Sequence, residues 1–115
     1  MNKQDYDYAQ EVVSSFKQCI ISNIYSTGFL SQRFQIRFED IKRATDRVRL
    51  SSGIIEDYIA FLEQQGIRAF TDNIFSIMCE VDLTHTYLTP IEAEKVSSNM
   101  EAYNARITYE QLQNS

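Results

Sequence analysis

The 115-residue sequence is poor in proline, glycine, histidine and cysteine, and it has no tryptophan. One proline, three glycines and no low-complexity tract leave no candidate linker, so we expect a single domain over residues 1–115. No apolar run approaches the roughly 18 residues that a membrane-spanning helix needs. The N-terminal segment also lacks the apolar centre of a signal peptide. These absences predict a soluble, cytoplasmic protein.

The few cysteines and the lone histidine argue against metal and redox chemistry. Cys19 and Cys79 lie in apolar patterns without the spacing of metal ligands or of a CxxC pair, so we expect two buried free thiols. His85 has no second histidine or cysteine cluster beside it, and we therefore expect no metal site. Glycine-rich phosphate loops and nucleophile elbows are missing as well. We expect no cofactor, no catalytic residue and no enzymatic activity.

Hydrophobic periodicity divides the first half of the chain into three elements. Apolar residues at three- and four-residue spacing predict a helix over residues 5–26, which Gly28 ends. Strict alternation over residues 33–38 predicts a short, half-buried strand. A second helix is expected directly afterwards, with its inner face at Phe38, Ile41, Thr45 and Val48.

The second half of the chain predicts a helix, two strands and a final helix. The third helix is expected from Gly53 to Gln65, with Gly66 as its stop. Extended segments follow over residues 67–70 and 74–81, with a tight turn at Asp72-Asn73 or a second hairpin tip at residues 82–85. Threonine, proline and glutamate at the first, second and fourth positions of Thr89-Pro90-Ile91-Glu92 form a helix-start signal. We expect the last helix over residues 90–110.

Two motifs in this order resemble those of a known family. Leu62-Glu63-Gln64-Gln65-Gly66-Ile67 is similar to the Leu-Glu-x-x-Gly-Leu exit of the third helix in winged helix-turn-helix regulators of the PadR and MarR type. Tyr87-Leu88-Thr89 resembles the Tyr-x-Leu-Thr segment that closes their wing, with a spacing one residue shorter. The resemblance covers residues 33–96. It implies an α+β, mainly helical winged-helix fold with flanking helices, and a homodimeric DNA-binding protein that regulates transcription.

The basic residues are concentrated where such a domain meets DNA. Residues 33–49 contain six of the eleven Lys and Arg residues and three acidic residues, so the segment is net +3 in a chain that is net −5. Cations near phosphates carry much of the affinity for DNA. The resemblance implies DNA contacts at Lys42, Arg43, Arg47 and Arg49, at Arg68 near the wing, and at Ser51 and Ser52, either of which caps the third helix. The alternative is that the basic side chains pair with neighbouring acids and serve solubility.

The third helix itself favours a different partner. Its expected outward face, Ser52, Gly53, Glu56, Asp57, Ala60 and Glu63, has three acids and no Lys or Arg. Carboxylates in a major groove lie near phosphates and are repelled. The second hypothesis is therefore a protein-interaction module, such as an anti-repressor or a phage- or plasmid-type inhibitor, that does not bind DNA. It would bind a basic protein surface through Glu56, Asp57 and Glu63.

The last helix carries a short apolar seam. Its members, spaced 3, 4, 3 and 4 residues apart, are Ala93, Val96, Met100, Tyr103 and Ile107. In the resembled family, helices outside the winged core pair two subunits, and this implies a dimer interface at Val96, Met100, Tyr103 and Ile107. The same residues could pack against the first helix of their own chain, and two heptads do not distinguish the two arrangements.

Overall fold

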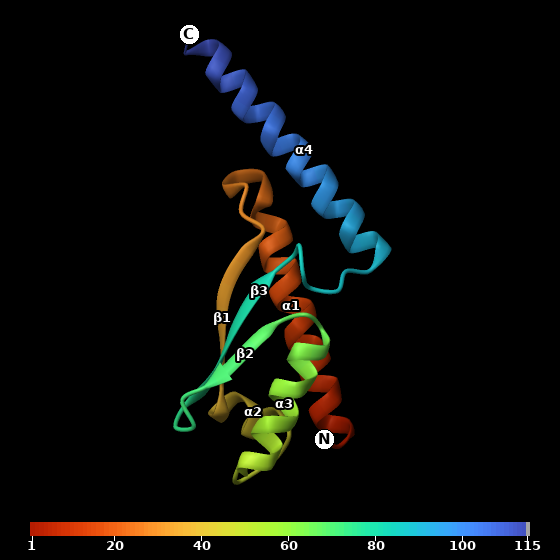
Figure 1. Ribbon diagram of the computed structural model, residues 1–115. Coiled ribbons are helices and arrows are strands. Elements are labelled where there is room, and N and C mark those ends of the chain that lie inside the picture. Colours follow the sequence, from red (N-terminus) through yellow and green to blue (C-terminus); the bar gives the residue numbers. More distant parts are fainter. Residues whose placement is uncertain (115) are drawn as a thin grey trace.

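The computed structural model describes residues 1–114 and contains four helices and three strands (Figure 1). The chain order confirms the expected helix, strand, helix, helix, strand, strand, helix, and the fold is α+β and mainly helical. The elements are α1 (Lys3–Thr27), β1 (Ser31–Arg37), α2 (Phe38–Ala44), α3 (Ser52–Gln64), β2 (Arg68–Thr71), β3 (Ser76–Asp82) and α4 (Pro90–Gln113).

The three strands form one antiparallel sheet in the order β1-β3-β2. β1 pairs with β3 from Ser31 opposite Asp82 to Arg37 opposite Ser76. β2 pairs with the other side of β3, and β2 and β3 form a hairpin whose turn lies between Thr71 and Ser76. Because side chains alternate between the faces of a strand, one face of the sheet is apolar and buried, and the outer face is mostly polar but also carries Phe70 opposite Met78.

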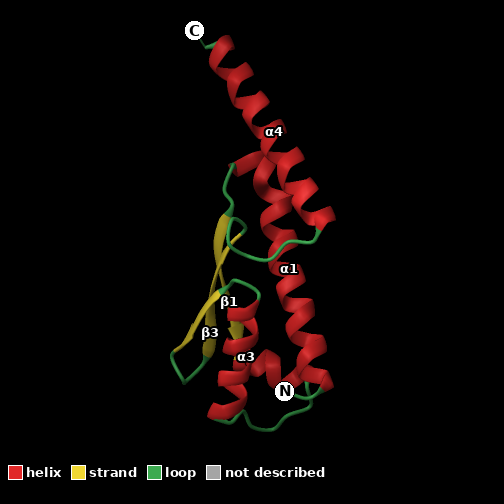
Figure 2. Ribbon diagram, turned by 45° about the vertical axis from the view of Figure 1, so that its right-hand side comes forward, coloured by secondary structure: helices red, strands yellow, loops and turns green. Residues whose placement is uncertain are grey.

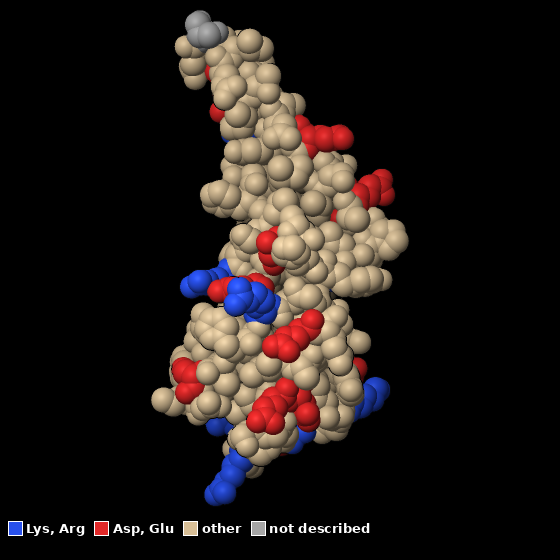
Figure 3. All heavy atoms as spheres, in the orientation of Figure 1, with Lys and Arg blue, Asp and Glu red and all other residues tan. Residues whose placement is uncertain are grey.

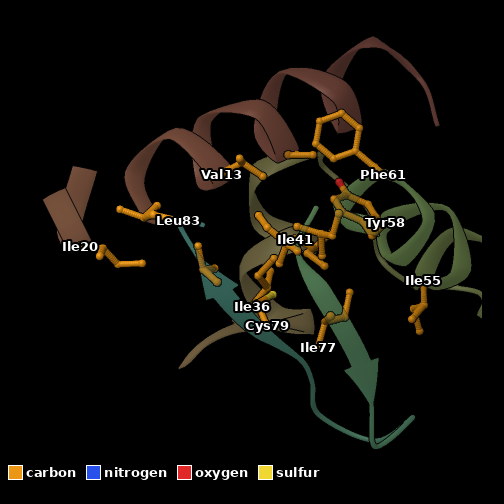
Figure 4. Close-up of a cluster of buried hydrophobic side chains, with 14 of the residues drawn as sticks. Val13, Ile20, Ile36, Ile41, Ile55, Tyr58, Phe61, Ile77, Cys79 and Leu83 are labelled. Carbon is orange, nitrogen blue, oxygen red and sulfur yellow. The ribbon is translucent and has the colours of Figure 1, made fainter. Parts of the chain in front are cut away.

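The hydrophobic core lies between the inner face of the sheet and the first three helices (Figure 4). Each element contributes apolar side chains at the spacing of its own period, as strands and amphipathic helices require. Tyr58, Ile41, Ile77 and Cys79 are among the most completely buried side chains. Cys79 is a free thiol, as expected, and Cys19 is a free thiol that is only partly buried.

Helix α1 begins and ends at strong local signals. The Asn2 side chain accepts from the Asp5 N–H, and the Asp5 carboxylate accepts from the Asn2 N–H, which makes a reciprocal capping box. Gly28 ends the helix with a φ of +69°, a value that favours glycine. The apolar face predicted over residues 5–26 is buried, and two charged residues, Asp5 and Lys17, are buried along with it.

Helix α4 begins beside the middle of α1 and runs past its end (Figures 1 and 2). The predicted Thr89 cap is confirmed, because the Thr89 and Glu92 side chains each accept from the other residue's N–H. Lys17 of α1 donates to Glu92 at 2.9 Å, and both side chains are buried. Since only the first part of α4 lies against the body, the molecule is elongated, with extents of 59 × 28 × 21 Å.

Within the described residues, no helix has the length and apolar character needed to cross a lipid bilayer. The alternative hairpin tip at residues 82–85 is a turn that leaves the sheet, and the Asp82 carboxylate accepts there from the N–H and hydroxyl of Thr84. The chain then crosses α1 to Thr89, where α4 begins (Figure 2).

Candidate interaction surface

The loop between α2 and α3 turns sharply at its start. The N–H and hydroxyl of Thr45 both donate to the Ile41 carbonyl, at 3.0 and 2.7 Å, and Asp46 has a φ of +53°. These features end α2 after Ala44. Val48 was expected on the inner face of a longer helix and is instead 88% exposed. That part of the prediction is wrong, because the periodic spacing continues through residues that are no longer helical.

Arg47 holds this loop against α1. Its guanidinium donates to the Asp5 carboxylate at 2.7 and 3.3 Å, and the Tyr58 hydroxyl donates to the same carboxylate at 2.9 Å. Asp5 is completely buried. Burial and the neighbouring Asp5 carboxylate raise the pKa of Tyr58 far above its usual range, so the phenol stays protonated and donates. Since the Arg47 guanidinium is engaged by the buried Asp5 carboxylate, with 24% of its side chain exposed, the geometry does not support the DNA contact expected for it.

The other basic residues of the corner lie on the surface. Lys42 is 3.2 Å from Glu39, and Arg43 is 3.7 Å from Asp40 with its side chain 75% exposed. Arg49 is exposed, and the described residues include no ion-pair partner for it. Exposed ion pairs stabilise by at most about 1 kcal/mol, so phosphate oxygens can replace these carboxylates. Lys42 and Arg43 can therefore pair with neighbouring acids in the free protein and still contact DNA, so the two alternatives considered from the sequence do not exclude each other.

Helix α3 begins at the same corner. Ser51 is its N-cap and accepts from the Ile54 N–H at 3.3 Å, while Ser52 is the first helical residue and is exposed. The first turn of α3 contains no acidic residue. The corner therefore combines exposed cations, a free serine side chain and the N-terminal end of a helix dipole, all of which suit an anion.

Acidic side chains occupy the rest of the exposed face of α3. Glu56, Asp57 and Glu63 are exposed, as expected, whereas Tyr58 and Leu62 are buried on the opposite face. Figure 3 shows acidic side chains over α3 and basic ones protruding at the end of the molecule where α2 and the start of α3 lie. The surface is therefore divided along α3 into a basic end and an acidic face.

Arg68 lies apart from this corner, on the outer face of the sheet. Glu80 stands between Arg68 and Arg33 in the strand register, at 3.7 and 3.1 Å from the two guanidinium groups. The Arg68 side chain is 86% exposed, so the wing contact expected for it needs a ligand that reaches the outer face of the sheet.

The turn between β2 and β3 is rigid and carries apolar residues that the sequence placed in a strand. One oxygen of Asp72 accepts from the N–H groups of Ile74, Phe75 and Ser76 at 2.9, 2.9 and 3.2 Å. Asn73 has a φ of +61°, which confirms the predicted turn. β3 begins at Ser76 and not at Ile74, which is 85% exposed. Aspartate two residues ahead of an apolar pair was the signal that could have identified this turn.

The apolar seam of α4 packs mainly within its own chain. Val96 and Met100 contact the hydrophobic core, and a Cβ on Gly28 would collide with the ring of Tyr103. Ile107 is half-buried. The sequence left two arrangements open, and the structure shows packing within the same chain for most of the seam. Only the part of α4 beyond α1 is therefore left for contact with a second subunit.

In residues 1–114, no three His, Cys, Asp or Glu side chains come close enough together to hold a metal ion. A hollow of about 390 Å³ lies between α2, the start of α3 and the β2–β3 turn, and its lining includes Lys42, Leu50 and Ile74. Searches of protein-family models, curated proteins and solved structures found no match to this chain.

Proposed function

We propose that this chain is a winged helix-turn-helix domain that binds DNA and regulates transcription in the cytoplasm. The element order and the β1-β3-β2 sheet support the fold, with α2 and α3 as the helix-turn-helix and the β2–β3 hairpin as the wing. The observation that carries the function is the basic end at the α2–α3 corner, where Lys42, Arg43 and Arg49 surround an exposed helix start in an acidic chain.

The division of α3 restricts how DNA is bound. Arg43 and Arg49 contact phosphates on the two sides of a groove, and Ser52 at the helix start lies closest to the bases. Glu56 and Glu63 lie further along α3 and stay outside the groove, because carboxylates close to phosphates are repelled. The helix therefore enters end-on, with its N-terminal turn foremost. Arg47 acts indirectly by fixing the loop that carries Arg49.

The second copy in the proposed homodimer meets this chain at the far end of α4. Beyond α1, the helix carries Tyr109, which is 63% exposed, and the adjacent end of α1 carries Tyr25 and Phe29, 49% and 69% exposed. An unsupported helix end is marginal in water, and aromatic side chains are enriched in interfaces. Val96, Met100 and Tyr103, first expected to contact the twin, serve mainly to position α4.

The acidic face favours a second candidate function. Glu56, Asp57 and Glu63 are exposed on a helix without any Lys or Arg, which suits a basic protein surface in an anti-repressor or inhibitor. In that case the basic end is only a solubilising surface, and the protein does not bind DNA.

A fluorescence-anisotropy titration of the purified protein against genomic DNA fragments, at 50 and 200 mM salt, tests the DNA-binding proposal. We expect binding at low salt that weakens as salt rises, because phosphate contacts release counterions. The double variant Arg43→Ala/Arg49→Ala removes two contacts and should reduce the slope of log K against log salt by about 2. The matched control Arg33→Ala/Lys95→Ala makes the same change in net charge away from the corner and should retain the slope.

The acidic residues separate the two candidate functions. Replacing Glu56 and Asp57 with Lys should strengthen DNA binding if the basic end meets DNA, because repulsion beside the groove becomes attraction. The same variant should abolish complex formation if a basic protein is the partner. Absence of any DNA binding by the unmodified protein at 50 mM salt would exclude the regulator.

A further inference from the structure

The turn at the tip of the proposed wing has an unusual chemistry for a DNA-contacting loop. It contains no Lys or Arg, and it exposes two large apolar side chains, Ile74, at 85%, and Phe75, at 52%. A large apolar side chain exposed on the surface is often neutral, but here it lies in the turn between β2 and β3 and lines the same hollow as residues of α2. A ligand for this turn must therefore be able to bury an isolated apolar side chain.

The tip is held in one conformation. Besides the three hydrogen bonds to Asp72, the Thr71 hydroxyl donates to the Ser76 carbonyl at 2.8 Å and accepts from the Asn73 N–H at 3.0 Å. The three N–H groups that bind the Asp72 carboxylate hold its pKa below the usual value. This carboxylate is engaged in the turn, so Asn73 and Ile74 are the side chains that the tip presents.

The tip is also fixed relative to the α2–α3 corner. The Phe38 N–H, at the start of α2, donates to the Phe75 carbonyl at 2.9 Å. Asn73, Ile74 and Phe75 form one wall of the hollow of about 390 Å³, and Lys42 lies on another. The apolar tip and one cation of the basic end, Lys42, therefore border the same hollow, which Glu39 also lines.

A DNA duplex can bind both the cations and the apolar side chain of the tip. Cations bind phosphates, and proteins that enter the minor groove insert isoleucine or phenylalanine between base pairs and contact the base edges with asparagine. We propose that the wing tip inserts Ile74 between two base pairs from the minor groove, with Asn73 on the adjacent base edges, and so bends the duplex. This inference rests on the proposed DNA binding and goes beyond it by assigning DNA distortion to the wing.

A doubly labelled duplex of about 30 base pairs tests the insertion. It carries a central TpA step, which is easily unstacked, with 2-aminopurine in place of its adenine and a donor–acceptor dye pair at its ends. We expect the unmodified protein to increase both the 2-aminopurine fluorescence and the energy transfer. Ile74→Ala should abolish both changes while affinity falls by less than about tenfold, because the cost of unstacking is lost with the contact.

Ile91→Ala is the matched control. Ile91 lies in the first turn of α4, is 67% exposed and loses the same atoms, so this variant should bend DNA as the unmodified protein does. Binding without bending or fluorescence change would overturn the insertion and leave the regulator proposal standing. Bending that persists in Ile74→Ala would also overturn it and would assign the exposed tip to a protein contact. Absence of binding would overturn both proposals.

Discussion

Asp5 connects three parts of the chain through one buried carboxylate. Burial alone would raise its pKa, but hydrogen bonds from Arg47, from the Asn2 N–H and from Tyr58 outweigh this effect and hold the pKa below its ordinary value of 3.8. Glu92 behaves in the same way. Burial would raise its pKa, but hydrogen bonds from Lys17 and Thr89 outweigh this effect and hold the pKa below 4.5. Both carboxylates are therefore more acidic in the folded protein than in the unfolded chain.

This difference predicts a loss of stability in acid. The unfolded chain takes up protons first as the pH falls toward 4.5 and then 3.8, and the folded state resists protonation until its own lower pKa values are reached. The free energy of unfolding should therefore decrease across this interval and level off below it. Urea titrations between pH 7 and pH 2.5 measure the decrease. Asp5→Asn should show a smaller decrease than the unmodified protein, and parallel curves would contradict the role of Asp5.

Gly66, where the chain leaves α3 for β2, admits no side chain. Its φ is +78°, and a Cβ would collide with the His85 carbonyl. Gly66→Ala should lower the free energy of unfolding by about 2 kcal/mol or more, since backbone strain is added to a steric clash. Gly53→Ala, in the first turn of α3, where a Cβ would meet the Ser51 hydroxyl at an ordinary 3.9 Å, should be neutral or stabilising by up to about 1 kcal/mol. Equal effects in thermal denaturation would contradict this explanation.

Helix α4 is held against α1 by the buried ion pair between Lys17 and Glu92, together with hydrogen bonds from the Asn99 and Arg106 side chains to carbonyls of α1. Removing one partner of a buried ion pair lowers the free energy of unfolding by more than the intact pair contributed, because the remaining buried charge has no counterion. Lys17→Met leaves the Glu92 carboxylate buried and should cost about 3 kcal/mol. Lys95→Met, on the exposed side of α4, should change stability by less than about 0.5 kcal/mol.

The double variant Lys17→Met/Glu92→Gln completes this comparison. It removes both charges and keeps a side-chain oxygen that can accept from the Thr89 N–H, so it should recover part of the loss. With the single variant Glu92→Gln added, chemical denaturation of the unmodified protein, the two single variants and the double variant measures the coupling between the two residues. A Lys17→Met protein as stable as Lys95→Met would show that the ion pair does not anchor α4.

Elements whose signals are local were predictable from the sequence. The Thr89 capping box, the stop at Gly66 and the turn at Asp72-Asn73 each depend on a few adjacent residues, and each is observed. α2 was predicted too long, because its spacing continues through Val48 although Thr45 and a left-handed residue end the helix.

Contacts between distant segments were not predictable in the same way. Arg47 and Asp5 are 42 residues apart, and nothing near Arg47 distinguishes a guanidinium bound to a distant carboxylate from one that is free to bind phosphate. Lys17, in contrast, was recognisable in the sequence, because it interrupts the apolar face of α1 and a buried charge requires a partner. Finding that partner in Glu92 needed the three-dimensional structure.

The molecule as a whole has two ends that face opposite ways. α2, the start of α3 and the β2–β3 turn lie at one end, and the last turns of α4 lie at the other (Figure 1). Helix α1 contacts both the α2–α3 loop, where Arg47 binds Asp5, and α4, where Glu92 binds Lys17.

Self-association should depend on the α4 end alone. We expect a dimer in light scattering at micromolar concentrations, and we expect Phe29→Glu/Tyr109→Glu to shift it to monomer, because a stable interface excludes unpaired charge. Ile91→Glu, also exposed and apolar in the native chain, should leave the dimer intact. A protein that is monomeric at 100 µM, or a dimer that survives the double replacement, would contradict this assignment.

The projection of α4 also decides how the protein should be attached to a surface. A biotin or fluorescent label coupled at the C-terminal end is carried away from the corner by the full length of the helix. Coupling ahead of Met1 places the label next to Asp57, whose carboxylate lies 3.4 Å from the terminal ammonium. Sensor chips loaded through the C-terminal end should therefore report full binding capacity, and chips loaded through the other end should not.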